Sequence, residues 1–485
     1  MLPPFSEDNA DDQQKPEAEN SSSKQLDFSP RIFSLDVLRG IAVLAALFVS
    51  IWLFGGFSTN KQNGLLLESK GFDYRLYGAM NLLLEGKMRA LIALVFGAGM
   101  LLFLTKDNVK GAVSNNDFFI RRQLWLIILG IINGILLLWS GDVLFHLGIM
   151  GILLFPFVRL SARGLVIASV IVLFIYSGKN YWRYDDDKKA YGKYVAVTKL
   201  EKKIEQDSIA KFAAGAKDIK KDTLTKKQQN EKQAWTGLIA SMKVDPKKDD
   251  GNNKSMRSKE YGKLWNHILP TTQARQAQWT YQFGVWDFAS MILLGMAVFK
   301  FGFFTSRFSK KHYFLLAITT ITLGLLFGWF RLHMNQVALH DYEKYVSRFW
   351  MPYNMLFPFE RAFLALGYTS LVLLCIASGF LNFVWKAFAK VGQLALSNYL
   401  MQSIILGFIF LGFGMGYFGR LQQVHLYFIV VEVIMVQVIF SVLWLRKYRY
   451  GPAELLWRRL VYGKWPTNRK SKPEIPESTI PALYQ

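Results

Sequence analysis

About ten apolar blocks, most of them close to 20 residues long, dominate this sequence and constrain its fold more than any other feature. A helix needs about 20 apolar residues to cross the hydrocarbon core of a bilayer. We therefore predict an all-α fold, a polytopic membrane helix bundle of about ten transmembrane helices. The blocks are residues 33–55, 88–104, 120–139, 143–160, 164–176, 285–304, 313–330, 362–381, 394–418 and 426–445.

Lysine and arginine are concentrated in alternate short loops, which by the positive-inside rule predicts that both termini are cytoplasmic. The long charged segment, residues 178–282, is then expected outside the cytoplasm. Its interleaved charges predict a solvated helix with i,i+4 charge pairs, and the alternative is an outer lid or docking element. The predicted parts are a disordered tail (1–30), helices one to five (31–177), the charged insert (178–282), helices six to ten (283–446) and a basic tail with an amphipathic helix (447–485).

The composition limits the predicted partners. A net charge of +23 favours nucleic acid binding in a soluble protein, but here the basic residues anchor membrane loops or lie in the insert without an aromatic stacking platform. We therefore expect a lipid bilayer and no nucleic acid. The single cysteine, Cys375, lies in an apolar run and is predicted to be a packing residue. The sequence contains no metal-ligand spacing and no phosphate-binding glycine loop, so we expect no metal and no bound cofactor.

The first apolar block opens with the motif Arg31-Ile-Phe-Ser-Leu-Asp-Val-Leu-Arg-Gly40. Asp36 and Arg39 are three residues apart and can form an ion pair on one helix face. Gly40 allows another backbone to approach closely. Because charge at membrane depth costs about 2.5–3.5 kcal/mol, such residues usually face the protein interior. The motif is either a structural anchor or part of a site.

Several motifs together resemble the YeiB-like family of bacterial membrane proteins, also described as domain of unknown function 418. Besides the opening motif, they are Phe96-Gly-Ala-Gly99, Gly141-Asp-Val-Leu144, Leu294-Gly295, Val391-Gly-Gln-Leu-Ala-Leu-Ser-Asn-Tyr-Leu-Met-Gln-Ser403 and Gly451-Pro-Ala-Glu-Leu-Leu-Trp-Arg-Arg459. The resemblance implies a bacterial inner-membrane protein.

That family in turn is distantly similar to membrane-embedded acyltransferases, including the heparan-glucosaminide acetyltransferases. The resemblance implies acyl-CoA as a cytoplasmic co-substrate and an acceptor modified on the other side of the membrane. It places Arg31, Asp36 and Arg39 at the entrance for the donor, where the arginine fork suits phosphates.

An acyl transfer needs a base, and the acetyltransferase relatives carry a histidine in the loop after the opening helix, whereas residues 56–87 contain none. Asn133 occupies the position where YeiB-like proteins often carry a histidine. His146 is expected at similar depth on the next helix, four residues after Asp142. We predict His146 as the catalytic base and Asp142 as the carboxylate that orients it. The alternative is that His146 only hydrogen-bonds a neighbouring helix or a water.

Asn398 and Gln402 form a polar stripe on the ninth block. We predict that they line the cytoplasmic half of a pocket beside Asp36 and Arg39 and bind the donor; the alternative is interhelical hydrogen bonding. Residues 453–461 read as an amphipathic membrane anchor with Trp457 at the lipid interface.

Other ionisable residues predicted on the outer side are scattered along the sequence and form no recognisable metal site: Arg89, Asp287, His333, His340, Asp341, Glu360 and Arg361. Three functions stay open. The first is transfer of an acyl group from acyl-CoA to an envelope acceptor, the second is a permease for a small or amphipathic solute, and the third is a non-catalytic envelope scaffold. A packed interior between Asp36 and Asp142 would contradict the first two. The oligomeric state does not follow from the sequence.

Overall fold

Helices make up nearly all of the structure. The computed structural model describes residues 32–105, 115–213, 223–245, 247–305 and 308–470. Within these ranges there is no β-strand, only an isolated bridge between Tyr448 and Arg469. The predicted all-α class is confirmed. Arg31, the N-terminal tail and the end of the basic C-terminal tail lie outside the described residues.

Eight helical segments in the described part of the chain are long and apolar enough to cross a membrane, which makes this a multi-pass membrane protein. They are Phe33–Phe54, Gly71–Leu104, Asn115–Ile135, Ala162–Lys211, Tyr261–Lys300, Lys310–His340, Phe357–Ser378 and Gln423–Lys447. A ninth would be the broken pair α15 (Asn382–Gln393) and α16 (Ala395–Phe410), whose axes differ by 79°.

The prediction of about ten spans is therefore approximate, and block 143–160 accounts for one difference. It forms only the ten-residue α6 (Leu144–Leu153), followed by a 3-10 turn over Phe155–Arg159. Pro156 opens this turn, and its missing N–H cannot continue an α-helix.

Glycines bring the central helices into close contact. A Cβ on Gly40 of α1 (Phe33–Phe54) would lie 2.1 Å from the carbonyl oxygen of Phe388 in α15. A Cβ on Gly392 would lie 1.8 Å from the carbonyl oxygen of Asp36. Since neither position has room for a side chain, the close backbone approach expected at Gly40 is confirmed.

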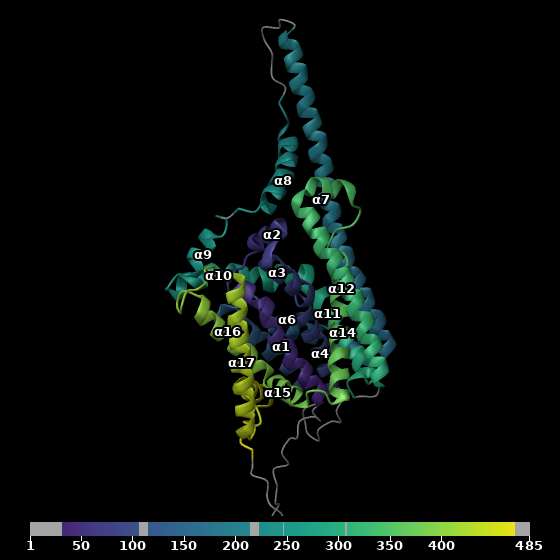
Figure 1. Ribbon diagram of the computed structural model, residues 1–485, viewed down its shortest axis with the longest axis vertical. Helices are drawn as coiled ribbons and strands as arrows, with labels where there is room; N and C mark the ends of the chain where they lie inside the picture. Colours follow the sequence, from purple (N-terminus) through teal and green to yellow (C-terminus); the bar gives the residue numbers. More distant parts are fainter. Residues whose placement is uncertain (1–31, 106–114, 214–222, 246, 306–307, 471–485) are drawn as a thin grey trace, which may run out of the picture. The chain divides into compact units, whose positions relative to one another are not determined.

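Further helices pack around this pair (Figure 1). The helix α4 (Lys87–Leu104) packs on α1 and on α11 (Val285–Lys300), and α12 (Lys310–His340) lies beside α14 (Phe357–Ser378). The helix α5 (Asn115–Ile135) packs on α6, and α17 (Gln423–Lys447) packs on α15 and α1. Buried apolar side chains of α1, α4, α11 and α14 form the main core.

The charged insert is helical and partly packed. The helix α7 (Ala162–Ala213) runs through the 177/178 boundary without a break and contacts α8 (Lys226–Met242) and α13 (Tyr342–Arg348). Trp235 of α8 is fully buried, with its ring centre 5.0 Å from that of Tyr191 and 5.9 Å from that of Tyr342. The insert thus carries a small aromatic core.

The chain returns from the insert to the bundle through α9 (Asp250–Met256) and α10 (Tyr261–Ala274) (Figure 1). A π-helical stretch, Arg275–Gly284, then joins α10 directly to α11 and contains the 282/283 boundary. Such stretches are rare and frequently found at functional sites. Two shorter helices, α2 (Thr59–Glu68) and α3 (Gly71–Leu83), contact α12.

Candidate functional site: two adjoining cavities

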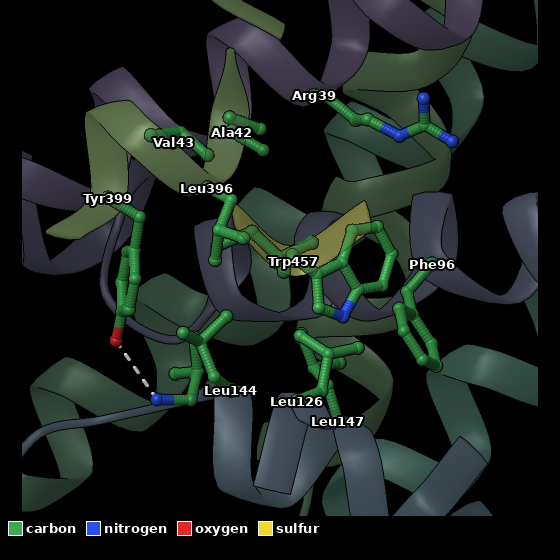
Figure 2. A pocket seen from close by; sticks show the side chains of 13 residues that line it. Arg39, Ala42, Val43, Phe96, Leu126, Leu144, Leu147, Leu396, Tyr399 and Trp457 are labelled. Carbon is green, nitrogen blue, oxygen red and sulfur yellow. Dashed lines mark hydrogen bonds between the residues drawn. The ribbon is translucent and has the colours of Figure 1, made fainter. Parts of the chain in front are cut away.

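A small apolar cavity of about 170 Å³ lies beside the N-terminal half of α1, and we name it the Arg39 pocket. Arg39 is the charged residue in its wall, and Figure 2 shows the side chains arranged around it. Three helices far apart in sequence contribute Phe96, Leu396 and Trp457. The lining residues are Arg39, Ala42, Val43, Ile92, Phe96, Leu126, Val143, Leu144, Leu147, Ala395, Leu396, Tyr399 and Trp457.

A larger polar cavity of about 540 Å³ lies beside the C-terminal half of α1, and we name it the Arg275 chamber. Its volume is in the range typical of small-molecule sites. Three charged residues line it: Glu85, Arg89 and Arg275. The remaining walls are Ala46, Val49, Ser50, Trp52, Leu53, Gly56, Phe57, Ser58, Thr59, Gln62, Leu84, Gly86, Met88, Ile92, Trp139, Gly141, Val143, Asn252, Tyr399 and Phe418.

The two cavities adjoin, because Ile92, Val143 and Tyr399 line both of them. One face of α1 follows them in turn, with Arg39 and Val43 at the pocket and then Ala46, Val49, Ser50 and Leu53 at the chamber. At 1.5 Å per residue, Arg39 and Leu53 are roughly 20 Å apart along the helix. The interior beside α1 therefore contains two cavities that share part of one wall.

Tyr399 of α16 stands at the junction of the two cavities. Its hydroxyl lies 3.2 Å from Oδ1 of Asp142, to which it donates a hydrogen bond. The same hydroxyl accepts hydrogen bonds from the backbone N–H of Val143 at 3.0 Å, drawn as the dashed line in Figure 2, and from Nε1 of Trp139 at 3.2 Å. The junction thus contains a phenol hydrogen-bonded to a buried carboxylate.

The predicted ion pair of the opening motif is present. Nη1 of Arg39 lies 3.0 Å from Oδ1 of Asp36, and the Asp36 side chain is buried while that of Arg39 stays 35% exposed. Arg39 is therefore fixed by Asp36 yet remains accessible at the pocket. The third residue of this prediction, Arg31, lies outside the described residues.

The structure does not bring Asn398 and Gln402 to the lining of the Arg39 pocket. Both are buried, and they face α17 and α1 instead. Asn398 donates to Oγ of Ser441 at 2.9 Å, and Gln402 donates to Oε1 of Gln437 at 3.0 Å. Gln437 donates in return to the carbonyl oxygen of Asn398 at 2.7 Å. These contacts hold α16 against α17, while Tyr399 on another face of α16 points to the cavities.

Asp142 and His146 are neighbours, but not through the contact that the sequence predicted. Nδ1 of His146 lies 3.0 Å from the backbone carbonyl oxygen of Asp142, rather than from its carboxylate. The carboxylate accepts hydrogen bonds from Asn133 at 2.8 Å and from the Phe145 N–H at 2.9 Å. An aspartate next to a helix start commonly caps it, and here that capping competes with the imidazole.

His146 is buried beside the Arg275 chamber and is not one of its lining residues. Its ring centre lies 5.2 Å from that of Trp279 and 5.3 Å from that of Phe288. Its Nε2 atom is buried and has no hydrogen-bond partner among the described residues. His146 therefore packs edge-on against the ring of Trp279.

Trp279, in the π-helical stretch, forms cation–π contacts with two arginines that line the chamber. The guanidinium carbon of Arg275 lies 4.7 Å from the ring centre and that of Arg89 lies 5.3 Å from it. Nε of Arg89 also forms an ion pair with Asp287 at 3.0 Å. Two arginines that line the same cavity thus contact the ring of one tryptophan.

Residues that are far apart in the sequence form a buried ionic network, which Arg89 joins through Asp287. Asp287 pairs with Arg361 as well as with Arg89. Glu360 lies 2.5 Å from Nζ of Lys87 and 2.7 Å from Nε of Arg331. These pairs connect α4, α11, α12 and α14 around the ring of Phe357, which lies within 6 Å of the cationic groups of Lys87, Arg331 and Arg361.

The amphipathic helix predicted over 453–461 forms as α18 (Pro452–Tyr462), but it packs on the bundle. Glu454 accepts hydrogen bonds from the backbone N–H of Leu396 at 2.8 Å and of Ser397 at 3.0 Å, which caps α16. Ser397 in return accepts from the N–H of Ala453 at 3.0 Å. Burial raises the pKa of Glu454, and the hydrogen bonds from Ser397 act in the opposite direction.

This reciprocal capping places Trp457 in the wall of the Arg39 pocket. The guanidinium of Arg122 lies 4.6 Å from its ring centre. Tyr399 and Trp457 were not selected from the sequence as site residues, although both lie inside the two C-terminal motifs. Arg275 had no such signal, because it lies at the end of the insert.

Comparisons with known proteins find one family model, and also bacterial relatives that match most of the chain. Residues 298–464 match the model of a family described as "Protein of unknown function (DUF418)". The chain is 26% identical over 452 residues to the "Uncharacterized protein YxaH" of Bacillus subtilis, covering 91% of this chain and 97% of that protein. It is 25% identical over 457 residues to the "Uncharacterized protein YeiB" of Escherichia coli, covering 89% and 96%. No solved structure matches.

Proposed function

We propose that this multi-pass membrane protein, which is similar over most of its length to uncharacterised proteins of two bacteria, transfers an acyl group across the junction of its two cavities. In this proposal a cytoplasmic acyl-CoA is the donor and places its acyl group in the Arg39 pocket. An acceptor of the cell envelope enters the Arg275 chamber from the other side.

One observation supports this proposal above all others: the two cavities meet at Tyr399, whose hydroxyl is hydrogen-bonded to the buried carboxylate of Asp142. An acyl transfer requires that donor and acceptor enter separately and meet at a group that can take a proton. A wholly apolar junction would not offer such a group.

The orientation that the proposal needs is the one predicted from the basic loops. With the N-terminus in the cytoplasm, the Arg39 end of α1 faces the donor side of the bacterial inner membrane. Arg39 is partly exposed there and can bind a phosphate of the donor, while the apolar pocket walls take the acyl chain.

At the junction the acceptor hydroxyl or amine attacks the thioester carbonyl, the C–S bond breaks, and coenzyme A leaves. The acceptor's proton passes through the hydroxyl of Tyr399 to Asp142 and from there to the departing sulfur. The proposal replaces His146 as base with Asp142, because the carboxylate and not the imidazole reaches the cavities through Tyr399. His146 acts as a positioning residue behind Trp279.

The test uses the purified full-length protein and acyl-CoA. Saturating acyl-CoA should raise the thermal unfolding temperature, because a ligand that binds only the folded state stabilises it. Arg39→Gln should weaken this shift, whereas Arg420→Gln, at an exposed arginine outside both cavities, should not.

Turnover is tested with membranes that contain the natural acceptors, by following label from acyl-CoA into envelope material. Tyr399→Phe should keep donor binding and lower the transfer rate by roughly 100-fold or more, since general acid–base groups contribute about that much. Tyr417→Phe, at an exposed tyrosine, is the matched control. Full transfer activity of Tyr399→Phe would contradict the proposal.

A permease is the second candidate function, and the broken pair α15–α16 favours it. Discontinuous helices that line a central site are a recurring feature of transporters. Here the break precedes Ala395 and Leu396, which line the Arg39 pocket. If vesicles containing the protein accumulate an amphipathic solute, and Tyr399→Phe leaves this uptake intact without any acyl transfer, the permease replaces the transferase.

A further inference from the structure

The Arg275 chamber has an unusual charge balance. Among the described residues Arg89 forms an ion pair with one acidic residue, Asp287, which also pairs with Arg361. Arg275 forms no ion pair with any described residue, and its Nε atom is buried without a hydrogen-bond partner. A partly buried cation without an acidic partner is costly, unless an anion joins it.

Glu85 is the one acidic residue among those that line the chamber, and it does not remove this excess. Its carboxylate lies 3.9 Å from Nη1 of Arg331 and also accepts a hydrogen bond from Asn81. The lining of the chamber therefore carries two basic residues, Arg89 and Arg275, against one acidic residue.

The excess positive charge lies where a ligand has room. Arg89 and Arg275 are both chamber-lining residues, and the ring of Trp279 holds both guanidinium groups at its surface. The ring attracts each cation but adds no negative charge. Small polar groups from other helices line the same cavity, among them Ser50, Gln62 and Asn252.

We propose that the Arg275 chamber binds a phosphate group, with Arg89 and Arg275 as its two ligands. This inference rests on the proposed function in one respect, namely that the phosphate belongs to the acceptor. A planar carboxylate is satisfied by a single arginine fork, whereas a tetrahedral phosphate presents enough oxygen atoms for two guanidinium groups. The extra charge of a phosphate also offsets the positive excess of the chamber.

Asn252 indicates how the chamber is closed on the side of the insert. It belongs to α9, and Ser58, the N-cap of α2, donates a hydrogen bond at 2.5 Å to Asp249, just before α9. The insert therefore contributes one wall through α9 and the arginine ligand Arg275 at its end. This arrangement gives the insert a binding role beyond that of a solvated surface.

The experiment measures equilibrium binding of radiolabelled inorganic phosphate to the full-length protein in a neutral detergent, at constant ionic strength set with chloride. We expect saturable binding that glycerol phosphate displaces and that acetate does not. Arg275→Gln and Arg89→Gln should each raise the dissociation constant roughly tenfold or more, as expected for the loss of a charge-assisted hydrogen bond.

Arg348→Gln, at an exposed arginine of α13, is the matched control and should bind phosphate like the unchanged protein. Arg275→Lys keeps the charge without the fork, and should bind with intermediate affinity while its thermal unfolding temperature stays close to that of the unchanged protein. Phosphate binding no stronger than acetate binding, or an equal loss in Arg348→Gln, would overturn the proposal.

Two arms distinguish a lipid headgroup from a soluble phosphate. Nanodiscs of phosphatidylglycerol should inhibit phosphate binding relative to nanodiscs of phosphatidylcholine if the source is a lipid, and should have no effect if it is soluble. Either result supports the phosphate site. The readout does not depend on acyl-CoA, so the phosphate site can fail while donor binding at the Arg39 pocket stands, and the reverse.

Discussion

The Arg39 pocket and the Arg275 chamber are neighbours built in different ways. Apolar side chains form nearly all of the pocket, and its one arginine is paired with an aspartate three residues away. The chamber depends on ion pairs between distant parts of the chain, such as Arg89 with Asp287. From this difference we expect the pocket to select a ligand by shape and apolar contact, and the chamber to select one by charge.

The largest expected effect concerns the buried ionic network next to the Arg275 chamber, and Glu360 is the residue to change. Glu360→Gln leaves Lys87 and Arg331 buried around a neutral side chain, and loss of one member of a buried ion pair typically costs about 3–5 kcal/mol. The thermal unfolding temperature should fall strongly. Glu260→Gln, which removes an exposed partner of Lys263, should change it little. Equal shifts in the two variants would show that the network does not stabilise the chamber.

The next effect concerns the pocket alone. Trp457→Ala removes a wall of the Arg39 pocket and should weaken acyl-CoA binding roughly tenfold or more, which corresponds to about 1.4 kcal/mol or more of lost contact. Phosphate binding in the chamber should persist. Trp465→Ala, at an exposed tryptophan after α18, serves as the control for both measurements. A loss of phosphate binding in Trp457→Ala alone would show that the cavities are not independent.

A smaller effect is expected where α18 joins the bundle. Glu454→Ala removes the acceptor for the backbone N–H groups of Leu396 and Ser397, and the loss of a helix cap costs about 0.5–2 kcal/mol. Hydrogen exchange should then increase in α18 and at the start of α16, with little change in α12. Unchanged protection in α18 would mean that its packing, rather than the cap, holds it beside the Arg39 pocket.

The sequence predicted the features that depend on neighbouring residues. The apolar blocks indicated the helical membrane fold, and the three-residue spacing indicated the pair of Asp36 and Arg39. It did not predict the ionic network, because Arg89 and Asp287 are 198 positions apart and only the packing of α4 on α11 joins them. The number of spans differs because Pro156 shortens one block, and because block 394–418 forms only the 16-residue α16, which is bent by 79° against α15.

Two site predictions show how a correct spacing can lead to a different contact. Asp142 and His146 are four residues apart and do touch, but the backbone carbonyl of Asp142 takes the imidazole while its carboxylate caps α6. Asn398 and Gln402 do form a stripe, yet the stripe faces α17. Spacing indicates which residues share a helix face, whereas the neighbour of that face depends on the packing of the whole bundle.

The smallest effect tests which face of α16 matters for the donor. Gln402→Met keeps the size of the side chain and removes its hydrogen bonds to Gln437 and Val43, and interhelical hydrogen bonds in membranes are worth about 0.6 kcal/mol each on average. The unfolding temperature should fall slightly while acyl-CoA affinity stays within twofold of the unchanged protein, roughly 0.4 kcal/mol. Because Gln402 faces α17 and Tyr399 faces the cavities, a large loss of donor affinity in Gln402→Met would return the donor-binding role to the stripe and weaken the assignment of the Arg39 pocket.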